Sequence, residues 1–343
     1  MDVLITGTGL VGSNAASRFI DEGYTVTAFD IQHRKVDYLE NAGSKLKLIQ
    51  GDVSDLQSFE SAVKQENPKT LVHTAIFPVS KDAHRLFDVN VRGAANAIEM
   101  ARKYNLRLIY ISSATIYGQL GGKGNIRENE PFGPAFPPRK QDSEWASAYC
   151  MSKRFSEKWA AMYQALFGLH VTCLRLGWVY GRGDIGGRIG PRMNAGVPLL
   201  LRKALAGQPL HLPYGGDTFS HFVNVRDVAE AIFKAATVPK LKSLAYNIAY
   251  EKGYWMKEVA KVIMQLVPGS DLKLGRGLWP SKGVPFPRGA ISWPTNRHLD
   301  IARAKRELGY KPSYDLVKGV EEYAAWMKKN WDLCSPEVVP FPA

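Results

Sequence analysis

Six short apolar segments alternate with helical patterns in the first 180 residues of this 343-residue chain. The strand-like segments span residues 2–6, 24–29, 46–50, 70–75, 106–112 and 170–176. The helical patterns span residues 11–22, 55–65, 82–104 and 143–167. Apolar strands that alternate with helices form parallel sheets with helices on both faces. The chain is therefore predicted to be an α/β protein built on a doubly wound parallel sheet.

The composition changes after Gly181, where glycine and proline become frequent. The chain is predicted to return to the sheet with a strand at 221–225, a helix at 228–236 and a strand at 245–249. The segment 268–294 is predicted to be rich in loops. Helices are predicted at 301–308, with Gly309 as C-cap, and at 316–329. We therefore expect one domain over 1–181 with 219–249, a smaller substrate domain over 182–218 and 250–330, and a tail over 331–343.

A glycine-rich turn, Gly7-Thr8-Gly9-Leu10-Val11-Gly12, follows the first strand and opens the first helix. In this pattern the first glycine permits a tight turn and the second admits a pyrophosphate close to the backbone. The third lets the helix pack on the strand, and the helix N-terminus attracts the phosphates. The turn therefore predicts a Rossmann-type dinucleotide site with Gly7, Gly9, Leu10, Val11 and Gly12 at the cofactor.

Acidic residues follow the next two strands. Asp30 lies 18 residues past Gly12, near the spacing of a carboxylate that binds the adenosine ribose. That charge favours NAD over NADP, although Arg34 and Lys35 nearby can serve a 2′-phosphate. Asp52 and Val53 follow the third strand, where a side chain can meet adenine; a turn or the N-cap of helix 55–65 is the alternative for Asp52.

Tyr149 and Lys153 lie one turn apart on the helix predicted at 143–167, so they share a face. An ammonium beside a phenol stabilises the phenolate, which can remove a proton from a substrate hydroxyl. Ser113 ends the fifth strand, where its hydroxyl faces the point at which strand ends converge. These three residues are the candidate catalytic group.

Together these motifs resemble the extended short-chain dehydrogenase/reductases, the NAD-dependent epimerase/dehydratase family that includes UDP-galactose 4-epimerase-like enzymes. The resemblance covers about residues 1–330. It implies that Tyr149 is the catalytic acid or base, that Lys153 holds the nicotinamide ribose, and that Ser113 hydrogen-bonds the reacting oxygen. It also implies that Ala75 and Asn90 line the cofactor site and that helices 82–104 and 143–167 pair in a homodimer.

Four further positions are expected to contact substrate: Thr115, Trp178, Ser220 and Arg288. Ala114 and Thr115 replace the acid pair of the family's dehydratases, so dehydration is not expected. Trp178 and Ser220 replace an asparagine and an arginine that anchor diphosphates in nucleotide-sugar enzymes. Losing an arginine–phosphate contact weakens binding by ~1.5–3 kcal/mol, which suggests a different anchor.

Other features limit partners and location. The net charge is +13, but basic residues are dispersed and no nucleic-acid-binding motif accompanies them, so no nucleic-acid partner is predicted. The three cysteines are scattered and the histidines lack the spacing of metal ligands, so no metal is predicted. No apolar run is long enough to span a membrane, and a cytoplasmic location is predicted. The long connection between Ser113 and Tyr149, which includes Arg139 and Lys140, is either a substrate lid or a surface insertion.

These observations predict an NAD-dependent oxidoreductase that acts on a secondary alcohol of a sugar or sugar-like molecule. Epimerisation and dehydrogenation share the same first step and both stay open. A reductase of a non-sugar carbonyl, suggested by Trp145, Trp178 and Trp293, is one alternative. A catalytically silent NAD-binding scaffold is the other, although the intact Tyr149 and Lys153 argue against it.

Overall fold

A parallel sheet of seven strands forms the centre of the molecule, in the order β3-β2-β1-β4-β5-β6-β11. The structure is a computed structural model that describes residues 2–32, 36–40, 42–77, 82–118, 124–133, 143–184, 196–277 and 297–334. The strands are β1 (Asp2–Thr6), β2 (Thr25–Asp30), β3 (Leu46–Gln50), β4 (Thr70–His73), β5 (Arg107–Ser113), β6 (Val171–Leu176) and β11 (Ala245–Ile248). The order reverses between β1 and β4, and α/β sheets bind ligands at the carboxyl ends beside such a reversal.

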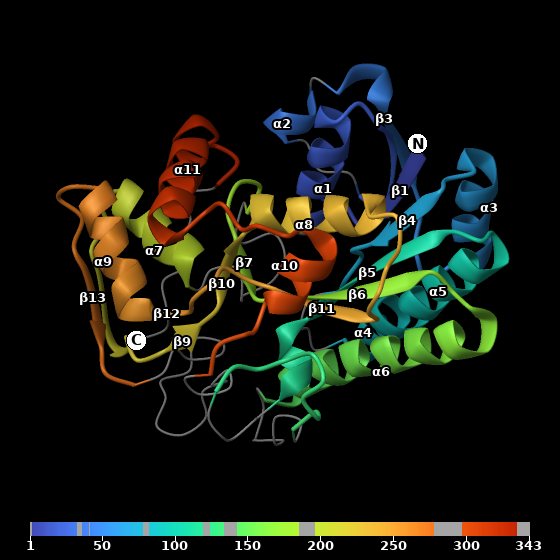
Figure 1. Cartoon of the computed structure of the whole chain (residues 1–343). Helices are drawn as coiled ribbons and strands as arrows, with labels where there is room; N and C mark the ends of the chain where they lie inside the picture. The colour runs from blue at the N-terminus through green and yellow to red at the C-terminus, as the bar shows by residue number, and fades with distance from the viewer. Residues whose placement is uncertain are drawn as a thin grey trace.

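Helices cover both faces of this sheet (Figure 1). One face carries α1 (Leu10–Asp21), α8 (Val225–Thr237) and α10 (Ala302–Leu308). The other carries α3 (Leu56–Glu66), α5 (Gly93–Lys103) and α6 (Ser143–Phe167). Successive strand residues point to opposite faces, so Val3 and Ile5 pack in the first core and Leu4 in the second. Burial on both faces explains why the strands are continuously apolar.

A third core lies in a smaller lobe beside the sheet. It is built from α7 (Val197–Leu205), α9 (Met256–Leu266), α11 (Leu316–Lys329) and the paired strands β8 (Leu210–Gly215) and β13 (Leu272–Gly275). The short pair of β7 (Trp178–Tyr180) with β10 (Phe222–Asn224) contributes residues to the first and the third core. A second short pair joins β9 (Phe219–Ser220) to β12 (Tyr254–Trp255). Two further short segments, α2 (Asp37–Glu40) and the 3-10 turn Gly43–Lys45, precede β3.

Several predicted elements of the first half are confirmed with the same ends, among them the strands at 2–6 and 46–50 and the helix at 143–167. The single helix predicted at 82–104 is instead α4 (Ala83–Phe87), a π-helical turn (Asp88–Arg92) and α5. The π-helical turn brings Asn90 inside, where it is 3% exposed. Such turns inside α-helices are frequent at functional sites.

The second half differs more from the expectations. β10 pairs with β7 outside the main sheet, whereas β11 joins β6 as expected. Helix α10 falls in the segment assigned to the substrate domain, yet Ala304 and Leu308 pack in the core of the large sheet. β13 lies in the stretch expected to be loop-rich. Gly309 ends α10 with a φ of 68°, which confirms the predicted C-cap.

Candidate active site

The glycine-rich turn joins β1 to α1 and touches the end of β4. Gly7 has a φ of +82°, and a Cβ there would lie 2.6 Å from the Ala75 Cα. A Cβ on Gly12 would lie 1.8 Å from the Gly7 carbonyl oxygen, so the helix cannot approach the strand with a larger residue. At Gly9 no atom lies within 4 Å of such a Cβ. The turn is therefore closed toward the sheet and open at Gly9.

Helix α1 begins at Leu10 with Gly9 as its N-cap, and no side chain caps it. The first N–H groups of a helix have no partner within the helix and attract anions together with the helix dipole. Leu10 and Val11 supply these groups beside the open face of Gly9. The turn therefore fits the pyrophosphate of a dinucleotide.

Asp30 ends β2 and reaches back to the same turn. Its Oδ2 accepts hydrogen bonds from the Thr8 backbone N–H and from the Thr8 hydroxyl, the latter at 2.8 Å. Its Oδ1 accepts from the Gln32 N–H at 3.2 Å. Thr8 was not singled out in the sequence because a residue between two glycines carries no signal of its own, yet it holds the carboxylate at the strand end. Arg34 and Lys35 lie outside the described residues.

Asp52 is held in a tight turn rather than at a helix end. Its Oδ1 accepts from the Ser54 N–H at 2.8 Å, and its Oδ2 accepts from Arg85 at 2.6 Å. Burial acts to raise the pKa of Asp52, but the bonds from Ser54 and Arg85 outweigh it and the pKa is lowered. Asp55 caps α3, so the N-cap alternative for Asp52 is wrong and the turn alternative fits. The contact with adenine stays a prediction.

Ala75 and Asn90 lie close to the end of β4. Ala75 packs against Gly7, and the Asn90 side-chain amide binds both backbone groups of Phe77. Its Oδ1 accepts from the Phe77 N–H at 2.7 Å and its Nδ2 donates to the Phe77 carbonyl at 3.1 Å. Val53 packs against Gly93 at the start of α5, since a Cβ on Gly93 would lie 2.6 Å from Val53 Cγ2. These contacts fix the segment that follows β4.

Helix α6 packs Tyr149 and Lys153 against β5. Lys153 Nζ lies 5.9 Å from the centre of the Tyr149 ring and donates to the Ile111 carbonyl at 2.6 Å. Cys150 Sγ donates to the Thr115 carbonyl at 3.1 Å. Ser113, which ends β5 between these two contacts, accepts from the Thr115 hydroxyl at 3.0 Å. The structure thus gathers the three candidate catalytic residues and Thr115 around the end of β5.

Burial changes the acidity of this group. Lys153 is 4% exposed. Burial lowers its pKa to about 8, although Cys173 and Glu157 act to raise it. Burial and the charge of Lys153 also lower the pKa of His73 to about 3, so His73 is neutral and accepts or donates one bond with Thr6. Among the contacts described for Tyr149, the buried ammonium of Lys153 is the cation that lies beside its ring.

The buried ammonium predicts a pH dependence of stability. The folded pKa of about 8 lies below the ordinary value of 10.5, so between these pH values the unfolded chain binds more protons than the folded chain. The free energy of unfolding of the wild type should therefore rise, relative to Lys153→Met, as the pH rises through this window. The expected rise is on the order of 3 kcal/mol. Urea titrations from pH 7 to 10.5 measure it, and parallel curves for the two proteins would contradict it.

The expected substrate contacts are only partly described. Trp178 on β7 packs on Phe222 with ring centres 5.5 Å apart. Ser220 on β9 is 1% exposed, and its buried hydroxyl has no hydrogen-bond partner among the residues that the structure describes. Next to it, burial lowers the pKa of His221 to about 4, so its ring is neutral. The side chains of Trp178, Ser220 and His221 therefore carry no charge.

Several other expectations fall on residues that the structure does not describe. These are Arg288, Trp293, residues 119–123 and 134–142 of the proposed lid, which include Arg139 and Lys140, and the side chain of Trp145. Among the described residues, no cluster of histidine, cysteine or acidic side chains could hold a metal ion, and no helix is long and apolar enough to cross a bilayer. The cysteines Cys150, Cys173 and Cys334 are free and buried.

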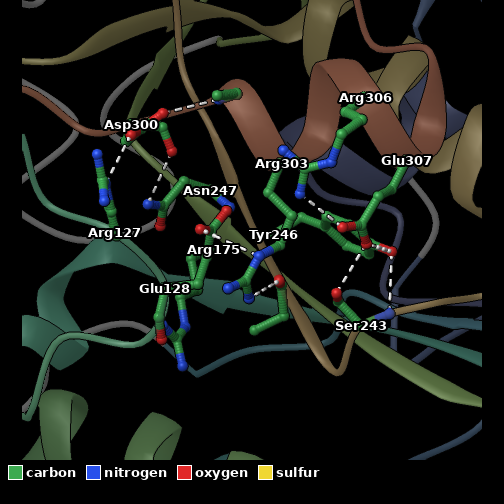
Figure 2. Close-up of polar contacts among 12 residues, drawn as sticks. Arg127, Glu128, Arg175, Ser243, Tyr246, Asn247, Asp300, Arg303, Arg306 and Glu307 are labelled. Carbon is green, nitrogen blue, oxygen red and sulfur yellow. Dashed lines mark hydrogen bonds and ion pairs between the residues drawn. The ribbon is translucent and has the colours of Figure 1, made fainter.

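A buried polar network under α6 was not predicted. Arg175 on β6 binds Glu157 of α6 with a shortest distance of 2.6 Å, and both side chains are almost fully buried. Arg175 also donates to the Glu128 carbonyl at 2.9 Å. The Glu128 carboxylate accepts from the Asn247 N–H and faces Arg303 of α10, as Figure 2 shows. Glu157 lies four residues after Lys153, a spacing that places it on the same helix face.

Comparisons with known proteins agree with this architecture. Residues 3–249 match the model of the NAD dependent epimerase/dehydratase family. A putative UDP-glucose 4-epimerase of Methanocaldococcus jannaschii is 26% identical over 340 residues, which cover 96% of this chain and 99% of the relative. The structure of a Thermotoga maritima UDP-glucose 4-epimerase with UDP-glucose has a TM-score of 0.80 at 22% identity, covering 96% of this chain and 100% of that one. The Thermus thermophilus UDP-glucose 4-epimerase in complex with NAD has a TM-score of 0.76 at 23% identity, covering 96% and 99%.

Proposed function

This chain belongs to the NAD-dependent epimerase/dehydratase family, and we propose that it transfers hydride between NAD and a secondary alcohol carbon of a sugar or sugar-like substrate. The observation that carries the proposal is the pairing of Tyr149 with the buried Lys153 near Ser113. Ser113 ends β5 at the same edge of the sheet as the glycine-rich turn, the edge formed by the carboxyl ends of the strands. A scaffold without chemistry gains nothing from an ammonium buried next to a phenol, because that burial costs stability.

Each part of the cofactor has a proposed set of partners. The N–H groups of Gly9, Leu10 and Val11 bind the pyrophosphate, with Gly7 and Gly12 shaping the turn. Asp30 binds the adenosine ribose, and Asp52 and Val53 face the adenine. Ala75, Asn90 and Lys153 line the nicotinamide half. A carboxylate at Asp30 disfavours a 2′-phosphate, so NADP is the weaker candidate.

Oxidised NAD, when bound, supplies the hydride acceptor. We propose that Tyr149 removes the proton from the substrate hydroxyl and that Ser113 donates a hydrogen bond to the same oxygen. Lys153 stabilises the phenolate of Tyr149, since a nearby cation favours the charged form. The Thr115 hydroxyl donates to Ser113 Oγ, which leaves the Ser113 proton for the substrate.

The family and the residues expected to contact substrate support the proposed substrate class. The relatives compared above are named for UDP-glucose, which supports a carbohydrate. The neutral Trp178, Ser220 and His221 offer no charge to a diphosphate. We therefore keep two net reactions, epimerisation of a sugar and dehydrogenation of a smaller sugar or sugar acid.

One assay separates these outcomes. The purified chain is incubated with NAD⁺ and a panel of sugars, sugar acids, nucleotide sugars and non-sugar alcohols. NADH absorbance that accumulates with turnover identifies a dehydrogenase and its substrate. An isomer that forms without NADH accumulation identifies an epimerase. NAD binding without turnover of any compound would contradict the proposed chemistry and leave a scaffold, and turnover of the non-sugar alcohols alone would replace the substrate class.

We further propose that a second copy of the chain packs on α6. The helix exposes Phe155 (41%), Met162 (36%) and Leu166 (66%), and Phe155 stacks on Trp159 of the same stripe. These residues recur at helical spacing, so they form one apolar face. Exposed contiguous apolar faces of this kind commonly bind another protein surface.

The homodimer predicts the effect of charge on that face. Phe155→Glu combined with Met162→Glu should convert a dimer into a folded monomer, because two buried carboxylates in the interface would lack partners. Light scattering after size exclusion measures the mass, and circular dichroism checks the fold. Leu48→Glu on the exposed edge of β3 is the matched control and should stay dimeric. A monomeric wild type would contradict the proposal.

We also propose that the protein is located in the cytoplasm. Three free buried thiols suit a reducing compartment. Cell fractionation of the tagged chain tests this, and recovery with secreted or membrane fractions would contradict it.

A further inference from the structure

Two buried side chains hold the glycine-rich turn from behind. The Ser13 hydroxyl donates to the Gly9 carbonyl at 2.8 Å, and Asn14 Nδ2 donates to the Leu10 carbonyl at 2.9 Å. Ser13 is 2% exposed and Asn14 is 1% exposed, so both side chains lie behind the turn and not on the surface that would receive a dinucleotide. The Gly9 carbonyl shares a planar peptide with the Leu10 N–H, and the Leu10 carbonyl shares one with the Val11 N–H. The Gly9 carbonyl also accepts from the Ser13 backbone N–H at 3.0 Å, so the two side chains add to the bonds that orient the peptides proposed to face the pyrophosphate.

Tyr38 of α2 completes this arrangement. Its hydroxyl lies 2.8 Å from Ser13 Oγ and accepts from Asn14 Nδ2 at 3.1 Å. Either oxygen can be the donor in the bond between Ser13 and Tyr38, and Tyr38 is the donor when the Ser13 proton is directed to Gly9 O. One phenol therefore joins the two side chains that hold the turn.

The phenol is itself enclosed by the segment after β7. The Arg182 guanidinium lies 4.4 Å above the Tyr38 ring centre and donates through Nε to Asn14 Oδ1 at 2.9 Å. Gly183 has a φ of +84°, and a Cβ there would lie 2.3 Å from the Tyr38 hydroxyl oxygen. The position of the hydroxyl is thus determined by the chain around it.

The residue before Tyr38 connects this group to the other lobe. Asp37 Oδ1 accepts from Trp326 Nε1 at 3.0 Å, and Asp37 Oδ2 accepts from Lys329 Nζ at 3.0 Å. Both donors belong to α11, the helix at the top of the smaller lobe in Figure 1. The contacts therefore run from α11 through Asp37 and Tyr38 to Ser13 and Gly9.

We infer that Tyr38 is a positioning residue for the dinucleotide turn, held in place by Asp37 and α11. It does not touch the reacting atoms; it helps to orient the Gly9–Leu10 and Leu10–Val11 peptides, so that the N–H groups of Leu10 and Val11 meet the pyrophosphate. The inference rests on the proposed function, because it assumes that a dinucleotide binds at this turn. It adds that a helix of the substrate lobe contributes to cofactor affinity.

Removing the Tyr38 hydroxyl tests this inference. Tyr38→Phe should raise the Kd and the KM for NAD⁺ by about two- to tenfold, the range of one net hydrogen bond. It should leave kcat and the KM of the second substrate unchanged, whereas a general loss of structure would change all of them. Titration calorimetry with NAD⁺ measures the Kd. The matched control is Tyr104→Phe, which removes a phenol hydroxyl at the end of α5 that donates to Glu60 of α3.

Two further variants make the outcome decisive. In Ser13→Ala the path to Gly9 is already broken, so adding Tyr38→Phe should cost less affinity than it does in the wild type. Asp37→Asn should weaken NAD⁺ binding in the same direction as Tyr38→Phe. If the wild type binds NAD⁺ and Tyr38→Phe binds it equally well, the positioning role is overturned. If the wild type binds no dinucleotide, the proposed function fails instead.

Discussion

Replacing Tyr149 by phenylalanine is expected to lower kcat by about 10²–10⁴-fold, the usual contribution of a positioned acid or base. The change removes one oxygen and leaves the ring, so the packing of the half-buried side chain should be kept. Lys153 would still donate to Ile111 and would still be available to the cofactor. The Kd for NAD⁺ should therefore stay close to that of the wild type.

Steady-state kinetics and calorimetry on the same preparations measure both quantities. Tyr24→Phe is the matched control, because Tyr24 precedes β2 at the opposite end of the sheet and packs on Phe19 and Phe233. It should keep full activity. Unchanged turnover in Tyr149→Phe would remove the proposed chemistry, and a lost NAD⁺ affinity would show that Tyr149 acts through cofactor binding instead.

Replacing Glu157 by glutamine is expected to lower the free energy of unfolding by about 3–5 kcal/mol, because it leaves a buried guanidinium without its carboxylate. Glu157 is 3% and Arg175 6% exposed at the side chain, and two nitrogens of Arg175 bind the carboxylate. The remaining partners of Arg175, the Tyr117 hydroxyl and the Glu128 carbonyl, are neutral. They accept hydrogen bonds but do not balance the charge.

Urea unfolding measures this cost. The double variant Glu157→Leu with Arg175→Met should be less destabilised than Glu157→Gln, since no unpaired charge stays buried. Glu22→Gln is the surface control: Glu22 pairs with Arg18 on the exposed side of α1, and its loss should cost less than ~1 kcal/mol. Equal losses for Glu157→Gln and Glu22→Gln would show that the buried pair contributes no more than a surface pair.

The parts of the fold that were predicted share one property: their signal is local. The short apolar runs of β1 and β3 are visible in the sequence, although only β1 is buried and Leu48 of β3 is 52% exposed. Helix α6 carries an apolar residue at each helical repeat, so all three elements were predicted with their correct ends. The glycine-rich turn is equally local, because a positive φ at Gly7 and the close contacts of Gly12 admit no other residue. Family membership followed from such motifs and agrees with the family match over residues 3–249.

The parts that were missed depend on partners far away in the chain. β7, β9 and β12 have two or three residues each and are defined by their pairing, not by their composition. β10 lies within the strand predicted at 221–225, but it pairs with β7 outside the main sheet. The π-helical turn that buries Asn90 depends on the Phe77 backbone, which the amide of Asn90 binds. α10 joins the core of the main sheet although its sequence lies within the predicted substrate domain.

Composition and spacing along the chain were enough to specify the parallel sheet, the dinucleotide turn and the Tyr149–Lys153 pair, because a backbone conformation or a helix face is set within a few residues. The partner of Glu157, the contacts from α11 to Gly9 and the burial of the Ser220 hydroxyl came from three-dimensional packing. Those features join residues that are 18 to more than 280 positions apart. Which polar groups meet after burial depends on the packing of every element between them, and a linear pattern does not contain that information.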